Sequence, residues 1–222
     1  MNISKLKNLR NKRKETKYIK NFFLSKLGYV DGFMLDLGCG WGFWTKKLEP
    51  NCKFVIGLDT RDIFPRSKLS RKLTFILADG RNLPFRDESF EGVTLFEVLE
   101  HAYNDLEFLR EINRVLKKEG FLFLSTPNKE RLFHQIRKIV GKPVTYPLSL
   151  GIDHYTLRDT QEQWHFQEYS DKELVKLLED TGFEICNIKG IGLGFGKIAI
   201  FAFPGFCERF TRTWLVNAVK LR

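Results

Sequence analysis

The stretch Leu35-Asp36-Leu37-Gly38-Cys39-Gly40-Trp41-Gly42 decides the fold. It closes an apolar run, 33–37, and opens an amphipathic segment, 41–48, so we expect a strand, a glycine-rich turn and a helix. Glycine lets a backbone turn tightly and come close to a ligand, because it has no Cβ. The stretch therefore predicts a ligand-binding turn at the carboxyl end of a strand.

The chain after this turn continues to alternate short apolar runs with amphipathic segments. Further strands are expected at 54–58, 73–77, 92–96, 121–125, 184–189 and 197–203, and helices at 3–28, 105–117 and 170–181. Strands that are apolar along their length and separated by helices indicate a parallel sheet covered on both faces. We therefore predict an α/β fold: a Rossmann-like, mostly parallel seven-stranded sheet with helices on both faces.

Residues 127–169 interrupt this alternation. They hold three prolines and an aromatic- and His-rich tract at 146–169. We interpret them as a substrate lid inserted after the fifth strand, over the carboxyl edge where ligands bind in open α/β folds. The 222 residues then form a single domain, with a basic helix at 1–28 and an amphipathic helix at 204–222.

The formal charge of +10 is concentrated at the two ends of the chain: residues 1–20 carry a net +7 and residues 197–222 a net +4. Such ends attract anionic lipid or nucleic acid, or serve as solubilising faces. In the expected C-terminal helix an apolar stripe repeats every four residues: Phe206, Phe210, Trp214 and Ala218. We expect this stripe to pack on the domain or on a second subunit of a homodimer, with peripheral contact to an anionic membrane as the alternative.

The cysteines and the hydropathy pattern bear on the compartment. The four cysteines are scattered, with no zinc-ligand spacing and no disulfide framework, and we expect no metal site. No apolar segment follows the basic N-terminal cluster as in a signal peptide, and the longest apolar stretch, 191–206, is too short and interrupted to span a membrane. We expect a cytoplasmic setting, with peripheral membrane association left open.

Three acids indicate which ligand the glycine turn binds. Its G-x-G-x-G spacing departs from the G-x-G-x-x-G of nicotinamide and flavin enzymes, and Asp36 would repel a pyrophosphate but suits an ammonium and a sulfonium. Asp59 ends the second strand, where an acid accepts hydrogen bonds from ribose hydroxyls. Asp79 ends the third strand and is positioned to accept from an adenine amino group.

These acids, with the stretches 81–90, 96–101 and 125–128, resemble the class I S-adenosylmethionine-dependent methyltransferases of the type 11 group, which includes ubiquinone- and menaquinone-biosynthesis enzymes. The resemblance covers roughly residues 30–190, with Glu91 in place of the family's usual Asp. It implies S-adenosyl-L-methionine as the methyl donor. It also implies a cofactor site made of Asp36, Gly38, Cys39, Gly40, Asp59, Thr60, Asp79, Gly80 and Phe96.

The absence of three motifs narrows the range of possible methyl acceptors. The fourth strand is followed neither by [DNS]-P-P-[YF], which serves planar amine and amide nitrogens, nor by a Pro-Cys nucleophile, and no catechol-type magnesium site is apparent. We expect methyl transfer to oxygen, nitrogen or carbon of a small-molecule or lipid-like acceptor. An RNA methyltransferase or RNA-binding scaffold that uses the basic ends is the alternative, and a nicotinamide oxidoreductase is a third hypothesis.

His101 is the candidate catalytic base, at the end of the fourth strand. The neighbouring Glu100 can fix the tautomer of an imidazole and raise its basicity. Helix capping or a cofactor contact is the alternative role. His154, His165 and the aromatic residues near them are interpreted either as the wall of an apolar acceptor site or as anchors of a long loop.

Overall fold

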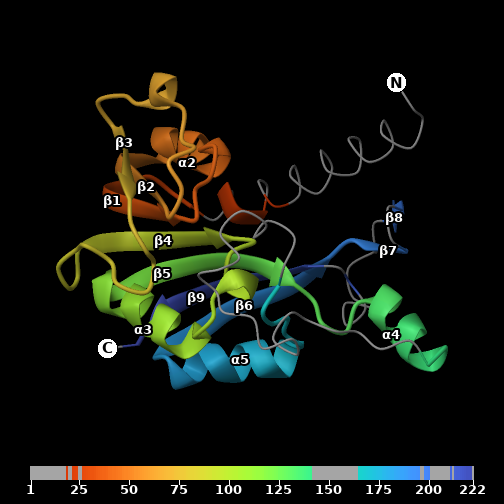
Figure 1. Ribbon diagram of the computed structural model, residues 1–222. Helices are drawn as coiled ribbons and strands as arrows, with labels where there is room; N and C mark the ends of the chain where they lie inside the picture. The colour runs from red at the N-terminus through yellow and green to blue at the C-terminus, as the bar shows by residue number, and fades with distance from the viewer. Residues whose placement is uncertain are drawn as a thin grey trace, which may run out of the picture.

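The computed structural model describes residues 19, 22–24, 27–141, 165–195, 198–200, 211 and 213–221. A seven-stranded sheet runs through them in the order β3-β2-β1-β4-β5-β9-β6 (Figure 1). The first five strands are parallel, whereas β9 is antiparallel to both β5 and β6. The predicted Rossmann-like, mostly parallel sheet is therefore confirmed.

The expected strands and helices that the structure describes lie close to their predicted ranges up to residue 191, and α4 is an additional helix within the segment interpreted as a lid. The strands of this sheet are β1 (Val30–Leu37), β2 (Cys52–Asp59), β3 (Leu73–Leu77), β4 (Phe90–Phe96), β5 (Leu116–Pro127), β6 (Phe183–Ile191) and β9 (Thr213–Lys220). The helices are α2 (Phe43–Leu48), α3 (Asp105–Val115), α4 (Leu132–Ile139) and α5 (Asp171–Asp180), with short 3-10 turns η1 (Glu49–Asn51), η2 (Arg66–Lys68) and η3 (Leu99–His101). Most of the expected helix at 3–28 lies outside the described residues.

Local sequence signals account for the ends of α5. Ser170 accepts a hydrogen bond from the backbone of Glu173, and the Glu173 side chain bonds back to the backbone of Ser170, which is the expected capping box. After the helix, Gly182 takes a φ of 85°, a conformation that favours glycine. α3, in contrast, ends at Val115 rather than at 117, because Leu116 already pairs with Phe90 as the first residue of β5.

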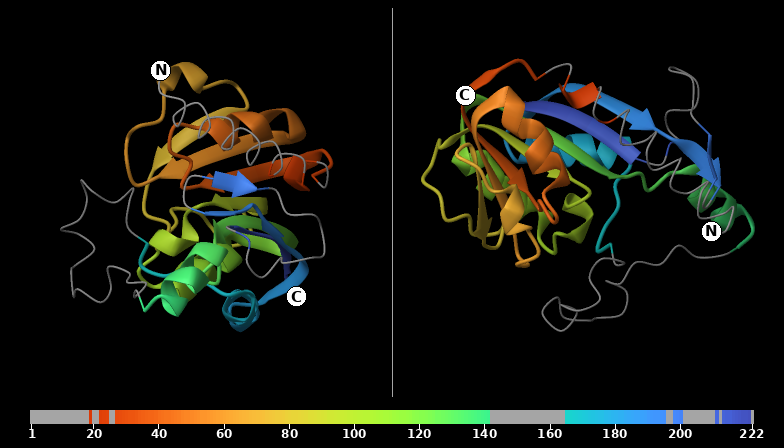
Figure 2. Two further views of the ribbon diagram at one scale, coloured as in Figure 1. Left: turned by 90° about the vertical axis from the view of Figure 1, so that its right-hand side faces the viewer. Right: turned by 90° about the horizontal axis from the view of Figure 1, so that it is seen from above.

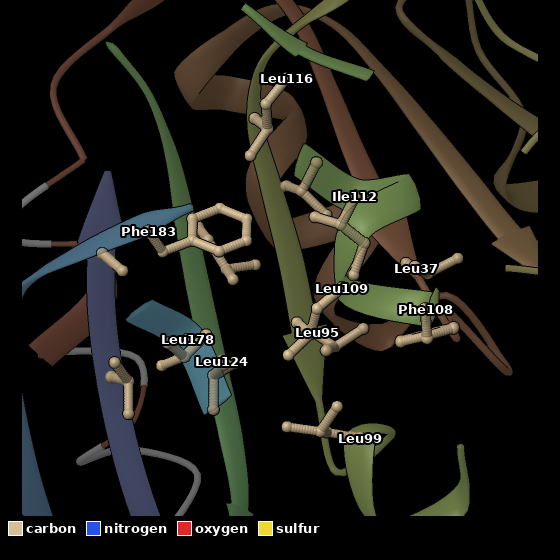
Figure 3. Packing of buried hydrophobic residues seen from close by; sticks show 14 of the residues in the cluster. Leu37, Leu95, Leu99, Phe108, Leu109, Ile112, Leu116, Leu124, Leu178 and Phe183 are labelled. Atoms are coloured by element: carbon tan, nitrogen blue, oxygen red, sulfur yellow. The ribbon is translucent and has the colours of Figure 1, made fainter. Parts of the chain in front are cut away.

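Two apolar layers lie on the two faces of the sheet. On one face α3 and α5 pack against β4 and β5, with buried side chains that include Leu95, Leu109, Leu124 and Leu178 (Figure 3). On the other face α2 and the segment around Phe23 pack over β1 and β2. Because successive strand residues point to opposite faces, Leu35 and Leu37 face α3, whereas the intervening Asp36 faces α2.

The predicted amphipathic helix at 204–222 is wrong over the residues that the structure describes. Thr213–Lys220 form β9, between β5 and β6. Trp214, Leu215, Val216 and Ala218 are each at most 3% exposed, so the apolar residues do pack within the domain, but in a strand. Four-residue spacing also keeps side chains on one face of a strand, and an interior strand is apolar on both faces, so the pattern did not separate the two structures.

This correction removes the basis for a membrane-binding or dimer-forming helical stripe at 213–220, while 204–210 lie outside the described residues. The expected strand at 197–203 is also wrong as a member of the main sheet. Its described part, β8 (Ile198–Ile200), pairs with β7 (Leu193–Phe195) in a separate two-stranded sheet. Within the described residues, no helix has the length and apolar character needed to cross a membrane.

The segment interpreted as a substrate lid is described at its two ends. Asn128 forms a β-bridge with Tyr169, and α4 extends beyond the carboxyl ends of β4 and β5, next to β7 (Figures 1 and 2). Residues 142–164 lie outside the described part. The lid and the single-domain organisation stay predictions.

The burial of β9 predicts unequal effects of two leucine substitutions in the C-terminal segment. Leu215 is 2% exposed, so Leu215→Ala should lower the free energy of unfolding by about 2–5 kcal/mol, as buried leucine truncations do. Leu221, just after the strand, is 48% exposed, and Leu221→Ala should change it by less than about 0.5 kcal/mol. Urea unfolding of both variants measures this, and equal effects would contradict the placement of β9.

Candidate cofactor and acceptor site

The glycine-rich turn connects β1 to α2 in a conformation that requires its glycines. Gly38, Gly40 and Gly42 have φ values of 73°, 48° and 69°. A Cβ on Gly38 would lie 2.4 Å from Val98, and one on Gly42 would lie 2.2 Å from Phe64. A Cβ on Gly40 would meet no atom within 4 Å. The turn is thus packed at both ends and open in the middle, where a ligand can approach the backbone.

Asp59 ties this turn to the end of β2. Its carboxylate accepts hydrogen bonds from the backbone N–H of Gly40 at 2.9 Å and from that of Arg61 at 3.0 Å. The residue is 6% exposed, and β2 and β1 are adjacent, so the acid lies next to the open middle of the turn. The predicted ribose acceptor therefore also shapes the glycine turn.

Asp36 lies beneath the turn, where it is 2% exposed. Its two oxygens accept hydrogen bonds from Thr45 Oγ1 of α2 at 2.6 Å and from Thr94 Oγ1 of β4 at 2.8 Å. Burial raises the pKa of Asp36 from 3.8 to about 6, although both hydroxyls favour the charged form. In this arrangement the carboxylate joins β1, α2 and β4 and contributes negative potential from below the turn.

The third acid, Asp79, is held by its neighbour Arg81. The guanidinium donates to both carboxylate oxygens, with Nη2 at 2.7 Å from Oδ2, and the Arg81 backbone N–H donates to Oδ1 at 2.9 Å. Gly80 has a packing reason to be glycine, because a Cβ there would lie 2.4 Å from the ring of Phe108 in α3. An adenine contact by Asp79 stays a prediction.

The remaining predicted cofactor residues differ in exposure. The Cys39 side chain is buried against β2, close to Gly57, and burial raises the pKa of its thiol. Thr60 is exposed just after Asp59. Phe96 is partly buried, with its ring 4.5 Å from that of Trp44 and 5.3 Å from that of Phe23. Cys39 and Phe96 thus have structural roles, and cofactor contacts by all three stay predictions.

A second polar group follows the end of β4, next to β1 at the point where the strand order reverses. Glu97 takes a φ of 55°, unusual for a residue other than glycine, and its carboxylate accepts from Ser125 Oγ at 2.8 Å. Glu100 is 1% exposed and accepts from Thr126 Oγ1 at 3.0 Å. Burial raises the pKa of Glu100 well above its usual value, and the charge of Glu97 adds to the shift.

His101 adjoins this group, but not in the geometry expected from the sequence. Its Nε2 lies 3.9 Å from Glu100 Oε1, too far for a hydrogen bond. The expected assistance of His101 by Glu100 therefore does not follow from this arrangement.

The segment 165–169 returns across the ends of β4 and β5 and brings His165 to His101, with ring centroids 5.1 Å apart. The backbone N–H of Phe166 donates to the carbonyl of Glu100 at 2.8 Å. The indole N–H of Trp214 in β9 donates to the carbonyl of Tyr169 at 3.2 Å. We call residues 165–169 the strap.

Glu168 anchors the strap from within. It is 1% exposed, receives a fork of hydrogen bonds from Arg131, and accepts from His165 Nδ1 at 2.7 Å. Burial opposes ionisation of Glu168, but the hydrogen bonds from His165 and Arg131 outweigh it, so its pKa lies below the usual value. His165 is thereby fixed in orientation with its other ring nitrogen directed away from Glu168.

Sequence reasoning missed several of the side chains that hold the two polar groups together. Thr45 and Thr94 lie on elements that were expected, but nothing in the sequence pairs them with Asp36. Glu168 and Arg131 are separated by 37 residues. The one available signal was the polar pair Ser125-Thr126 at the end of an apolar strand, which marks the carboxyl edge of the sheet.

The sequence and the fold both resemble known methyltransferases. Residues 35–124 match a family model described as a methyltransferase domain. A demethylmenaquinone methyltransferase of Lactobacillus johnsonii is 30% identical over 206 residues, which cover 82% of this chain and 80% of the relative. A probable S-adenosylmethionine-dependent methyltransferase of Mycolicibacterium smegmatis is 30% identical, and the match covers 78% of this chain and 60% of that protein.

Among solved structures, a chain from a Haloferax volcanii complex of a methyltransferase activator with a methyltransferase superposes with a TM-score of 0.68 at 20% identity. It covers 96% of this chain and 94% of that one. At this identity the likeness shows the fold.

The chain belongs to the class I S-adenosylmethionine-dependent methyltransferases. Its matched region is the methyltransferase domain of the type 11 group, as the resemblance implied, and S-adenosylmethionine is the methyl donor of this family. The chain spans 60% of the length of the Mycolicibacterium relative and 48% of a Mycobacterium tuberculosis relative.

Asp36 gives the stability a definite dependence on pH. Its pKa is higher in the folded chain than its ordinary value, so the folded state holds the proton more tightly, and the stability it contributes falls as pH rises from about 4 to about 6. Asp36→Asn removes this titration. We compare the free energy of unfolding of the variant with that of wild type at two pH values. The difference, variant minus wild type, should be larger by about 1 kcal/mol at about pH 7.5 than at about pH 5. Urea unfolding at both pH values measures the difference, and a constant difference would contradict it.

Asp59→Asn should weaken the binding of S-adenosylhomocysteine by about 1–3 kcal/mol, roughly 5- to 150-fold in Kd, because it removes the carboxylate that is the predicted acceptor for ribose hydroxyls and that accepts from the N–H of Gly40. Asp31→Asn is the matched control, since Asp31 is exposed near the opposite end of β1. Isothermal titration calorimetry of the two variants and wild type measures the affinities. Equal affinity in all three would remove Asp59 from the cofactor site.

Proposed function

We propose that this chain transfers a methyl group from S-adenosylmethionine to a small-molecule or lipid-like acceptor. The observation that carries the proposal is that two candidate sites lie side by side at the carboxyl ends of neighbouring strands. The glycine turn with Asp59 forms one, and the polar group around His101 and the strap forms the other. β1 and β4 are neighbours at the reversal of strand order, where ligands bind in open α/β sheets.

In the proposed reaction the methyl carbon forms a bond to the nucleophilic atom of the acceptor. The bond from this carbon to the sulfonium sulfur breaks, and its electron pair stays on sulfur, which gives S-adenosylhomocysteine. The main contribution of the chain is the alignment of the two reactants. Where the nucleophile carries a proton, His101 accepts it.

The relatives support a lipid-like acceptor more than RNA. The Lactobacillus johnsonii relative is named for demethylmenaquinone, a lipid-soluble quinone. The RNA alternative rests on the basic ends, and of these residues 1–18 lie outside the described part of the chain, while β9 belongs to the sheet. Incubation with labelled S-adenosylmethionine and separate metabolite, lipid and RNA extracts tests the proposal: label in RNA alone would overturn it.

Thermal unfolding tests directly which cofactor the chain binds. S-adenosylmethionine and S-adenosylhomocysteine should raise the Tm, because a ligand that binds only the folded state stabilises it, and NAD should not. A rise in Tm with NAD alone would contradict the assignment.

His101 should serve the acceptor rather than the cofactor. We expect His101→Ala to lower kcat by about 100-fold or more, the usual contribution of a positioned proton acceptor, while the Kd of S-adenosylhomocysteine changes less than about threefold. Single-turnover kinetics and calorimetry measure the two quantities. A parallel loss of both would make His101 a cofactor contact or a structural residue.

A further inference from the structure

We propose that Glu100, His101 and His165 bind one divalent transition-metal ion at the carboxyl ends of β4 and β5. Each side chain offers one donor atom, and the three donors lie within 4.8 Å of one another. Donors that share an ion at about 2.1 Å in tetrahedral geometry are roughly 3.4 Å apart. The 3.9 Å between His101 Nε2 and Glu100 Oε1 is about 0.5 Å longer than this spacing, and no pair of donors has to approach by more than about 1.4 Å.

The orientation of His165 matches that of a metal ligand. A ligating histidine usually has its other ring nitrogen bound to a carboxylate, which fixes the ring and its tautomer. Here Glu168 accepts from His165 Nδ1 at 2.7 Å, and Arg131 holds Glu168 in place by a fork of hydrogen bonds. With Nδ1 bonded to Glu168, Nε2 of His165 is the nitrogen left to bind an ion, and the ring lies 5.1 Å from that of His101, centroid to centroid. This support comes from side chains that are outside the proposed ligand set.

The burial of Glu100 supplies a second reason for a cation. The side chain is 1% exposed, and it lies three residues after Glu97, whose carboxylate belongs to the same polar group. Burying a carboxylate among other acids is costly unless a positive charge compensates it. An ion bound by Glu100 and two imidazoles provides that charge at the required point.

The donor set favours one class of ion. Two imidazole nitrogens and one carboxylate oxygen suit Zn²⁺, Mn²⁺, Fe²⁺ or Co²⁺ better than Mg²⁺, which prefers oxygen ligands. Three protein ligands also leave coordination positions open. On the proposed function, these positions receive an oxygen of the acceptor, which narrows the acceptor to compounds that present an oxygen ligand near the methylated atom. In the ion-bound protein His101 is then a ligand and not a proton acceptor.

Mn²⁺ is the probe for the test, because its free ion has a strong electron paramagnetic resonance signal and it has little affinity for thiols. The full chain is freed of metal with a chelator and titrated with Mn²⁺ in the absence of cofactor and acceptor. We expect one ion bound per chain. His101→Ala and His165→Ala should each weaken binding by at least about 10-fold, and the double variant should abolish it. Glu184→Gln, an exposed carboxyl of β6, is the control and should bind as wild type does.

A measurement on the wild-type chain guards against variants that do not fold. Mn²⁺ should slow the modification of His101 and His165 by diethylpyrocarbonate, read by mass spectrometry, because it occupies their nitrogens. Absence of a bound ion, or binding that survives the double variant, would overturn the inference. A chain that binds the ion but methylates no extract would overturn the proposed function alone, and methylation by a chain that binds no ion would overturn this inference alone.

Discussion

The buried carboxylate of Asp36 is the interaction on which the rest of the structure depends. It joins β1 to α2 through Thr45 and to β4 through Thr94, at the point where the strand order of the sheet reverses. A carboxylate that is 2% exposed is stable only when its oxygens are bonded, as both are here. These two bonds hold the glycine turn above Asp36 and set β4 beside it, so the acid fixes the relative position of the two strands after which the two halves of the site lie.

The second half depends on a different device, the strap at 165–169. Arg131 holds it from one side through Glu168, and the carbonyl of Glu100 holds it from the other through the N–H of Phe166. The result is a cluster of acids and imidazoles that no single element carries. Its members come from η3 and the strap, with hydrogen bonds from the hydroxyls of β5, so the cluster exists only when these are assembled. The half of the candidate site that contains Asp36, Asp59 and Asp79, in contrast, lies on the ends of β1, β2 and after β3.

The antiparallel strand β9 links the C-terminal segment to this site. Its Trp214 donates to the carbonyl of Tyr169 in the strap, and Asn128 at the end of β5 donates to the carbonyl of Thr211 just before β9. The residues that the sequence predicted as a C-terminal amphipathic helix therefore support the strap from inside the sheet. Their apolar character is explained by burial between β5 and β6.

The sequence by itself determined the parallel strands and their helices, the glycine turn, and the acids Asp36, Asp59 and Asp79, because these follow from local periodicity, turn chemistry and short spacing. It did not determine the fate of residues 213–220, because apolar residues at four-residue spacing share a face in a strand as well as in a helix. The tertiary structure alone decided that Thr45 and Thr94 bond to Asp36. It also decided that His165, from a distant segment, lies beside Glu100 and His101. Such contacts arise from the order of the strands and from the return of a distant segment to the same end of the sheet. Neither leaves a periodic pattern in the sequence.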